Sequence, residues 1–536
     1  MSGQFQPRSR IGTQSLQEHL RSPCGLSEKG LSEITQLVKV AEDDLDGYHA
    51  EILRLEARIV YLKSEHDRLV DHKSTLSSLL SPIHRLPNEI MIRIFTFSCD
   101  QNTLGHSKQS HTLDVSAVCS RWRALTLSCS ELWATFSIIL PPIVNERHDP
   151  QLLEYILDIF LERSKHQLLT ISIDAYGSSE HPLLHKVMQT SPRWRDLTLN
   201  VDVVRFSAPL HSCLIGLRLP ELQSACIVQP TGYGISTLDL LSGAPKLRDL
   251  HALSLPLSWT NPHSLSQITH LSYCPSFTNF YELLDWCPQL KTLYLSNFEH
   301  DRDIRARSIP AKQVPITSLT VSLAGYYPMV QDILLDSMES LVAPALTSLV
   351  LEQHGELPDN LYAPPSPFNA VDSFLARSAC PLTVLVLDSM PLTDCEVVAL
   401  LKRLPSLVEL TVTESKFENA LPITLDFVES LHSHKRSALR SSVNPILPKL
   451  QTLVLEVQVT ASEFEREGST LALIDVTVSR WLPEKSYAAS IGVSCLRSVE
   501  LYLLGPPRPG QFQLLEPYDK SGLRFVVGES RDFEYR

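Results

Sequence analysis

Several hallmarks of enzymes are missing from this 536-residue sequence. It has only 19 glycines, no complete glycine-rich phosphate motif, no H-E-x-x-H zinc-protease motif and no nucleophile elbow. The nearest approach, Gly232 to Thr237, lacks a third glycine and the following basic residue, which predicts a loop that opens a helix. We expect no catalysis, cofactor or metal, although residues far apart in sequence could still converge into a site.

Three further absences exclude other classes of protein. The 11 cysteines form no C-x-x-C pair, which argues against a zinc module or a disulfide framework and favours reduced thiols in the cytoplasm or nucleus. The net charge of −13 argues against nucleic acid or an anionic membrane as the main partner. Neither an apolar run of about 18 residues nor a signal-peptide core in residues 1–25 is present, so we expect no membrane span and no secretion.

What is present is an ordinary globular composition, with 43% apolar and 20% charged residues. We expect a disordered N-terminal segment over 1–25, because it is polar and lacks apolar periodicity. The Gly-Pro-Pro-Arg-Pro-Gly run after Leu504 interrupts the pattern near the other end, so 504–536 is expected to be a tail or a cap.

Residues 26–81 fit a single coiled-coil helix that Pro82 ends. One seam, position a, holds Leu31, Val38, Leu45, Ile52, Ile59, His66, Lys73 and Leu80. The other, position d, holds Ile34, Ala41, Tyr48, Leu55, Leu62, Leu69 and Leu76. Leucines at d with isoleucines at a are typical of a parallel two-stranded coil, so a homodimer through residues 31–80 is possible. The alternative is that the helix packs back on its own chain.

Residues 82–140 contain two short stretches of helical pattern with large apolar side chains. A proline that suits a helix start leads the first, and its apolar residues share one face. The second is expected as one helix over 113–126. So small a unit carries more apolar surface than it can bury, which favours a partner, although a self-contained core is the alternative. The apolar residues at helical spacing are Ile90, Ile94 and Phe95 in the first stretch and Val115, Val118, Trp122 and Leu125 in the second.

The succession L-P-x-E-I-x-x-x-I-F, V-C-S-R-W-R and L-W resembles the F-box, and in particular the F-box-like domains of fungal proteins. The resemblance implies that this domain docks onto a Skp-type adaptor, which links it to the cullin scaffold of a ubiquitin ligase. Carried over by position, it assigns nine residues to adaptor binding: Leu86, Pro87, Ile90, Ile94, Phe95, Val118, Cys119, Trp122 and Trp133. Trp122 and Trp133 are also the strongest candidates for an internal core.

The F-box pattern is interrupted by a long polar stretch over 98–112. Its polarity predicts a solvent-exposed loop. His106 and His111 lie in it and are expected to be solvated rather than metal ligands, because no further ligand-like cluster lies nearby.

From about residue 190 to 503 the chain repeats an apolar L-x-x-L-x-L unit, and in nine of eleven units a proline stands four or five residues before the middle position. Proline suits the start of a strand, and helical spacing often precedes it. The middle positions are Leu197, Ala225, Leu250, Leu271, Leu293, Leu319, Leu349, Leu385, Leu410, Leu453 and Val499.

This pattern resembles leucine-rich repeats, in which parallel strands line one face and helices pack outside. The expected fold is an α/β solenoid over 150–503, a leucine-rich-repeat-like array preceded by a small all-α F-box-like domain and a long N-terminal helix. Residues 152–161 (helix) and 168–173 (strand) are expected to cap it, and the long intervals around Leu453 to hold inserted loops. The asparagine that closes the usual repeat is replaced by Asp202, Phe298, Met390 and Ser415.

Together these features predict a non-catalytic substrate-recognition subunit of a Skp/cullin/F-box ubiquitin ligase. The repeats would hold an unknown protein substrate, since solenoids generally bind proteins on a large open face. Candidate contacts are Lys291, Thr292, Tyr294, Glu409 and Thr411, which could equally only solvate the sheet. The alternatives are a coiled-coil and repeat scaffold with no ligase role, or an enzyme with an unrecognised site.

Overall fold

The computed structural model describes most of the chain in two compact units, residues 1–93 and 94–536. The described residues are 8, 20–21, 28–105, 110–140, 150–175, 182–201, 217–228, 241, 243–252, 265–273, 284–296, 311–324, 338–339, 341–354, 366–414, 421–433, 445–457, 467–503 and 510–529. The expectations for His106, for Gly232 to Thr237 and for most of 1–25 lie outside these ranges.

The first unit contains one long helix, α2, Glu28–Leu79, over the segment expected to be helical. A short 3-10 helix, η1, Pro82–Arg85, follows it because Pro82 cannot donate a backbone hydrogen bond to a continuing helix. Helix α3, Asn88–Ser98, then begins directly after Pro87. None of the helices in the described ranges has both the length and the apolar character needed to cross a bilayer.

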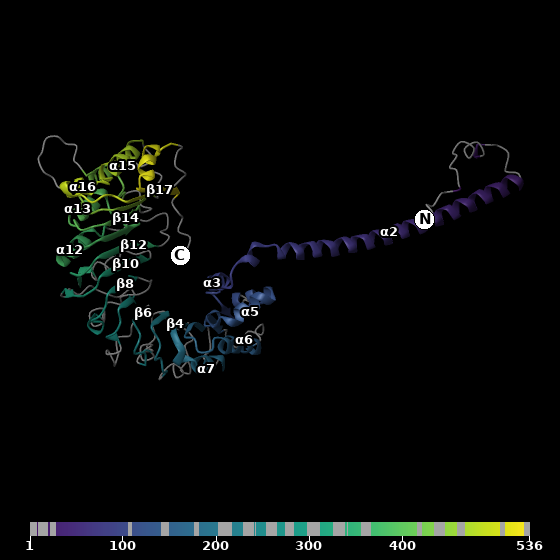
Figure 1. Cartoon of the computed structure of the whole chain (residues 1–536), viewed down its shortest axis with the longest axis horizontal. Coiled ribbons are helices and arrows are strands. Elements are labelled where there is room, and N and C mark those ends of the chain that lie inside the picture. The colour runs from purple at the N-terminus through teal and green to yellow at the C-terminus, as the bar shows by residue number, and fades with distance from the viewer. Residues whose placement is uncertain are drawn as a thin grey trace. The chain divides into compact units, whose positions relative to one another are not determined.

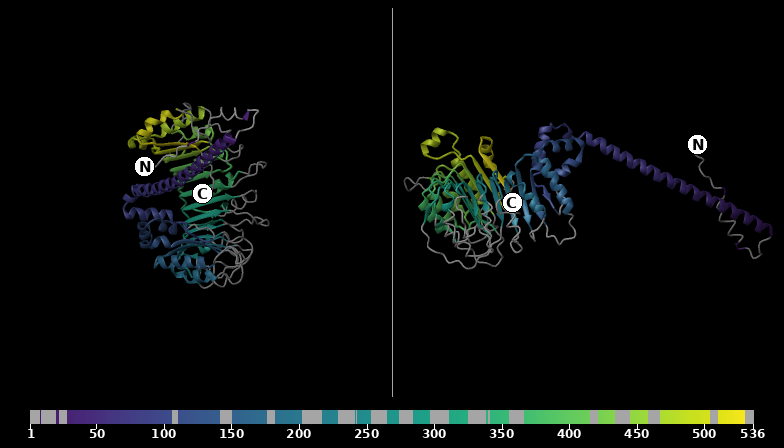
Figure 2. Two further views of the ribbon diagram at one scale, coloured as in Figure 1. Left: turned by 90° about the vertical axis from the view of Figure 1, so that its right-hand side faces the viewer. Right: turned by 90° about the horizontal axis from the view of Figure 1, so that it is seen from below.

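The second unit is built on a parallel sheet of 15 strands, seen as one curved array in Figures 1 and 2. Its strands are β1 Thr103–Leu104, β2 Thr135–Leu140, β3 Leu169–Ala175, β4 Trp194–Val201, β5 Ser224–Val228, β6 Asp249–Ala252, β7 His270–Tyr273, β8 Thr292–Ser296, β10 Ser318–Ala324, β12 Ser348–His354, β13 Val384–Asp388, β14 Glu409–Thr413, β15 Thr452–Glu456, β16 Ser498–Leu503 and β17 Arg524–Glu529. Strands β9 Lys312–Gln313 and β11 Leu341–Val342 form a separate pair.

The described helices of this unit alternate with the strands along the chain. They are α4 His111–Val118, α5 Ser120–Ser128, α6 Pro150–Arg163, α7 Pro182–Met188, α12 Phe368–Ser378, α13 Asp394–Lys402, α14 Leu425–Ser430, α15 Glu467–Arg480, α16 Lys485–Ile491 and α17 Glu516–Lys520, with 3-10 helices η2 Ser130–Trp133, η3 Ser191–Arg193 and η7 Gln513–Leu515. Helix α13 begins with a capping box between Thr393 and Glu396, which satisfies backbone donors at its first turn.

All eleven middle positions of the predicted repeat lie in one row of the sheet, each in register with the next. Every one of them is buried. The row continues through Ile171 and Phe136 at one end and Phe525 at the other. Because side chains alternate across a strand, this row and the parallel row two residues on form the core. The predicted α/β solenoid is therefore confirmed.

Threonines supply a ladder of side-chain hydrogen bonds at the start of several strands. Thr317, Thr347 and Thr383 each donate from Oγ1 to the carbonyl of the preceding repeat, at 3.2, 3.0 and 3.0 Å. Among the four positions without asparagine, the structure describes Met390, which is buried and apolar. The sequence signal for this ladder is the recurring threonine directly after the first leucine or isoleucine of the unit.

Two expectations about the array were wrong. The sheet begins with β1 and β2, so β3 lies inside it and does not cap it. The long intervals around Leu453 hold helices α14, α15 and α16 as well as loops, and apolar residues of these helices such as Phe427, Val428, Leu473 and Val476 are buried. The segment expected to be a tail or a cap, 504–536, contains β17 in its described part, and β17 pairs with β16 along six residues as the last strand of the sheet.

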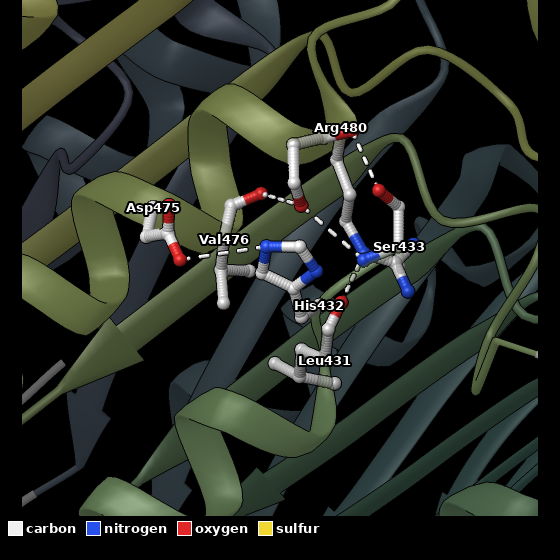
Figure 3. Close-up of polar contacts among 7 residues, drawn as sticks. Leu431, His432, Ser433, Asp475, Val476 and Arg480 are labelled. Carbon is white, nitrogen blue, oxygen red and sulfur yellow. Dashed lines mark hydrogen bonds and ion pairs between the residues drawn. The ribbon is translucent and has the colours of Figure 1, made fainter. Parts of the chain in front are cut away.

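Arg480, at the end of α15, forms hydrogen bonds with the chain segment that connects β14 to β15. Its side chain is fully buried and donates to the backbone carbonyls of Leu431, Leu447 and Ile446, the last two at 3.0 and 2.5 Å. Figure 3 shows its guanidinium directed at the Leu431 carbonyl. Burial lowers the pKa of Arg480 to about 10, so the side chain keeps its charge and its donors at neutral pH.

Candidate functional site

The predicted adaptor-binding residues begin in the first unit, where the chain enters α3. Leu86 is half-buried and Pro87 is exposed. The Pro87 carbonyl accepts the Met91 N–H at 3.1 Å, so Pro87 contributes to the first helical turn although it cannot donate. Ile90 follows with 45% of its side chain exposed.

The second unit starts with the other half of α3, where apolar side chains alternate between core and surface. Phe95 is buried and its ring lies 4.9 Å from that of Trp122, centroid to centroid. Ile94 and Phe97 are instead 40% and 71% exposed. Phe97 was not among the predicted residues, although its position seven residues after Ile90 places it near the same helix face.

The expected single helix over 113–126 is two helices, α4 and α5, separated at Cys119. Cys119 has an extended backbone, with φ −158° and ψ 171°, and its Sγ accepts the Trp122 N–H at 3.5 Å. The residue thus acts as the N-cap of α5 instead of continuing α4. Val118, just before the break, is 60% exposed, and Leu127 on α5 is 42% exposed.

Trp133 forms the centre of a buried aromatic cluster. Its ring lies 5.1 Å from that of Phe160 and beneath the Arg163 guanidinium at 4.5 Å. Its indole N–H donates to the Thr126 carbonyl at 2.9 Å. Phe95 and Trp133 have 1% and no exposed surface, so both fill the core and neither is accessible as an adaptor contact. For Trp133 this is the core role that the sequence analysis gave as the alternative.

The polar stretch over 98–112 is not simply a solvated loop, as its composition had predicted. Asn102 is fully buried, and its Nδ2 donates to the carbonyls of Cys99 at 2.8 Å and Thr135 at 3.0 Å. Its Oδ1 accepts the Thr112 N–H at 3.0 Å. Asn102 therefore connects the end of α3 with α4 and β2, and its hydrogen bonds allow this polar residue to be buried.

The histidine prediction can be examined for His111, which is exposed at the start of α4. Within the described residues, no group of three or more His, Cys, Asp or Glu side chains has the arrangement of a metal site. The structure therefore gives His111 no ligand partners among the residues it describes.

A second candidate surface is the half-buried face of the sheet, opposite the leucine rows. The predicted contacts Tyr294 and Thr411 lie in one row of this face, whereas Lys291 and Glu409 are exposed where β8 and β14 begin. Tyr294 Oη donates to Glu352 Oε1 at 3.1 Å across β10. Burial raises the pKa of Tyr294 and lowers that of His251 on the same face, which favours the neutral form of both.

The comparisons with known proteins bear on the helical part of this geometry. A family model described as F-box-like matches residues 83–139. These residues form an F-box-like domain. The resemblance expected from the sequence is thus confirmed over this segment, and the domain also contributes β1 and β2 to the sheet. No curated protein is significantly similar to the sequence.

Two solved structures similar to the chain are leucine-rich-repeat or internalin proteins. One is an internalin from Listeria monocytogenes, with 12% identity, 76% of this chain and 83% of that chain covered, and a TM-score of 0.25. The other is CroV588, described as a novel circular leucine-rich-repeat protein, with 14% identity, 74% and 52% coverage, and a TM-score of 0.28. The repeat assignment follows from the strand register described above and does not depend on these two likenesses.

The F-box-like domain exposes several large apolar side chains although its core is complete. They are Ile90, Ile94 and Phe97 on α3, Val118 on α4 and Leu127 on α5. Leu86, Cys119 and Trp122 are half-buried. Large apolar groups contribute binding energy when a partner removes them from water.

Proposed function

We propose that the F-box-like domain docks onto a Skp-type adaptor, and that the chain is a substrate-recognition subunit of a Skp/cullin/F-box ubiquitin ligase. The observation that carries this proposal is the set of exposed apolar side chains on α3, α4 and α5 in a domain whose aromatic core is already filled. Exposed Ile, Phe and Val side chains on neighbouring helices of a domain are typical of a protein interface.

The contacts that we propose are the accessible members of the predicted set: Leu86, Pro87, Ile90, Ile94, Val118, Cys119 and Trp122, with Phe97 added from the structure. Phe95 and Trp133 support them from beneath as core residues. This division explains why one motif can specify both a fold and an interface: one part of its apolar set fills the core and the other stays at the surface.

The repeat array would hold a protein substrate on its half-buried strand face. The ligase would then act by proximity, because a substrate held beside the transferring enzyme experiences a high effective concentration. Families of the F-box and repeat type generally serve as interaction modules, so we place no catalytic residue in this chain. A cytoplasmic or nuclear location, and the fungal kinship that the motif resembles, belong to the same proposal.

Single charges in the exposed apolar set should weaken adaptor binding. We expect Val118→Asp and Ile94→Asp, each made in the full-length chain, to raise the dissociation constant for a Skp-type adaptor about 10- to 100-fold, because each would bury an unpaired carboxylate at the interface. Both side chains are exposed in the free protein, so the fold should tolerate the change. Isothermal titration calorimetry under reducing conditions measures the effect.

Leu471→Asp provides the matched control. Leu471 is 57% exposed on α15, outside the F-box-like domain. Its replacement should therefore leave the dissociation constant for the adaptor unchanged. If all three variants bind as tightly as wild type, the proposed surface is wrong. If the wild-type chain itself binds no such adaptor, a scaffold of coiled coil and repeats without a ligase role becomes the better description.

A further inference from the structure

Helix α2 carries a continuous apolar seam that the rest of its own unit leaves uncovered. Ten of the apolar residues at positions a and d are between 46% and 67% exposed. They are Leu31, Val38, Leu45, Tyr48, Ile52, Leu55, Ile59, Leu62, Leu69 and Leu76. A row of this length is unfavourable in water, because large apolar side chains are stabilised when another surface removes them from solvent.

A described contact from the preceding chain to α2 lies beside the seam. The Arg8 N–H donates to both carboxylate oxygens of Asp44, at 3.1 and 2.9 Å, and Asp44 is the buried residue of this helix. Asp44 occupies position g, directly before Leu45. The contact therefore leaves the a and d residues open to another helix.

We propose that the occupant of this seam is α2 of a second copy of the chain, and that the two helices run antiparallel. In the register that pairs the helices over their whole length, Leu31 lies opposite Leu76 of the partner subunit. At the centre, Ile52 lies opposite Leu55 of the partner subunit. The inference does not depend on adaptor binding, and it differs from the parallel pairing that the heptads alone had suggested.

The core layers decide the orientation. A parallel pair places each residue against its own copy, so two Lys73 ammonium groups would meet in the seam, two His66 rings would meet one heptad away and two Ala41 side chains would leave a gap. In the antiparallel register, His66, Lys73 and Ala41 each face a different residue instead of their own copy. His66 faces the small Ala41 of the partner subunit, and Lys73 faces Ile34 of the partner subunit with its ammonium free to reach water.

Tyr48 and the flanking charges favour the same orientation. Tyr48 faces Ile59 of the partner subunit instead of a second tyrosine, so the large rings are spread over two layers. In a parallel pair, position g faces e of the next heptad, which sets Glu51 against a glutamate, Glu56, and Arg58 against a lysine, Lys63.

In an antiparallel pair, position g faces g, so Glu51 meets Arg58 of the partner subunit, an attraction that occurs twice. Glu51 is already held on its helix by two hydrogen bonds from Arg54, at 2.7 and 2.8 Å, which lower its pKa and keep it ionised. The like-charged pair that remains joins Asp44 to Glu65 of the partner subunit, and the hydrogen bonds from Arg8 already stabilise the Asp44 charge.

The consequence is a rod with one F-box-like domain following each end. Helix α2 spans 52 residues, or about 78 Å at a rise of about 1.5 Å per residue. Because Pro82 follows the C-terminal end of α2 in each chain, an antiparallel pair places the first residues of the two α3 helices roughly that far apart. A parallel pair would instead bring them together.

Engineered cysteines test the orientation in the full-length chain. Leu31→Cys and Leu76→Cys chains are purified separately, mixed, allowed to exchange subunits and oxidised, and the disulfide-linked peptides are identified by mass spectrometry. We expect a 31–76 disulfide at least about tenfold above the background, because facing residues have a high effective concentration. Leu76→Cys alone should form no link between its two copies, which would lie on the order of 70 Å apart.

Ala57→Cys, at the outward position f, measures the background from random collisions, and circular dichroism shows whether each variant keeps its helix. A disulfide between two copies of residue 76 would overturn the antiparallel orientation. A monomer in sedimentation of the wild-type chain at micromolar concentration would overturn the proposal altogether. Absence of the 31–76 link in a chain that does sediment as a dimer would show that a different surface pairs the two copies.

Discussion

Replacing Arg480 by methionine is expected to destabilise the C-terminal repeats by about 3 kcal/mol or more. The change keeps much of the side-chain length but removes every donor, and it leaves the carbonyls of Leu431, Ile446 and Leu447 without the partner they have now. A buried acceptor that loses its partner costs about 1–3 kcal/mol. The substitution also removes the cost of burying the guanidinium charge. The net destabilisation should therefore be smaller than the summed cost of three acceptors that each lose a hydrogen bond.

The effect should be local, because repeat arrays lose structure in neighbouring units and not all at once. Hydrogen exchange should show faster opening of α14, α15 and β15, while the strands before β10 keep their protection. Arg497→Met is the matched control, since Arg497 is exposed and should change little. Equal exchange in the two variants would contradict the role given to Arg480.

Asn102→Ala is expected to destabilise the start of the sheet by about 2–4 kcal/mol. The substitution removes three donated hydrogen bonds, to the carbonyls of Cys99, Leu132 and Thr135, and leaves the buried Thr112 N–H without its acceptor. Each loss falls in the range of about 1–3 kcal/mol for a buried polar group. The fragment around β1 should therefore loosen first, and with it the start of α4.

Exchange of the Thr112 amide is the direct measurement, because its hydrogen bond ends on the side chain that is removed. It should exchange faster in Asn102→Ala than in wild type. Gln101→Ala, a change at the exposed neighbouring residue, should leave it unaffected. An unchanged Thr112 amide in Asn102→Ala would mean that the backbone alone holds this segment.

The repeats were predictable because their signal is local and periodic. A leucine at a fixed place in each unit must point to the same side of every strand, so the sequence alone places Leu293, Leu349 and Leu453 in one buried row. The heptads of α2 were predictable for the same reason. Periodicity alone did not give the orientation of helix pairing, because parallel and antiparallel coils share it.

The polar anchors were not predictable in the same way. Arg480 bonds to carbonyls more than 30 residues away, and nothing in the neighbouring sequence marks it as buried. Asn102 looked like an ordinary loop residue for the same reason. The split between core and surface within the F-box motif also depended on tertiary packing, since Ile94 and Phe95 are adjacent in sequence and opposite in exposure.

The central claim, that the exposed apolar side chains of the F-box-like domain bind an adaptor, is tested most directly by hydrogen exchange of the full-length chain with and without a Skp-type adaptor. We expect new protection in α3, α4 and α5 and unchanged exchange in the strands from β6 to β16. Strong protection on the repeat strands with none on α3 to α5, or no change anywhere at saturating adaptor, would contradict the claim.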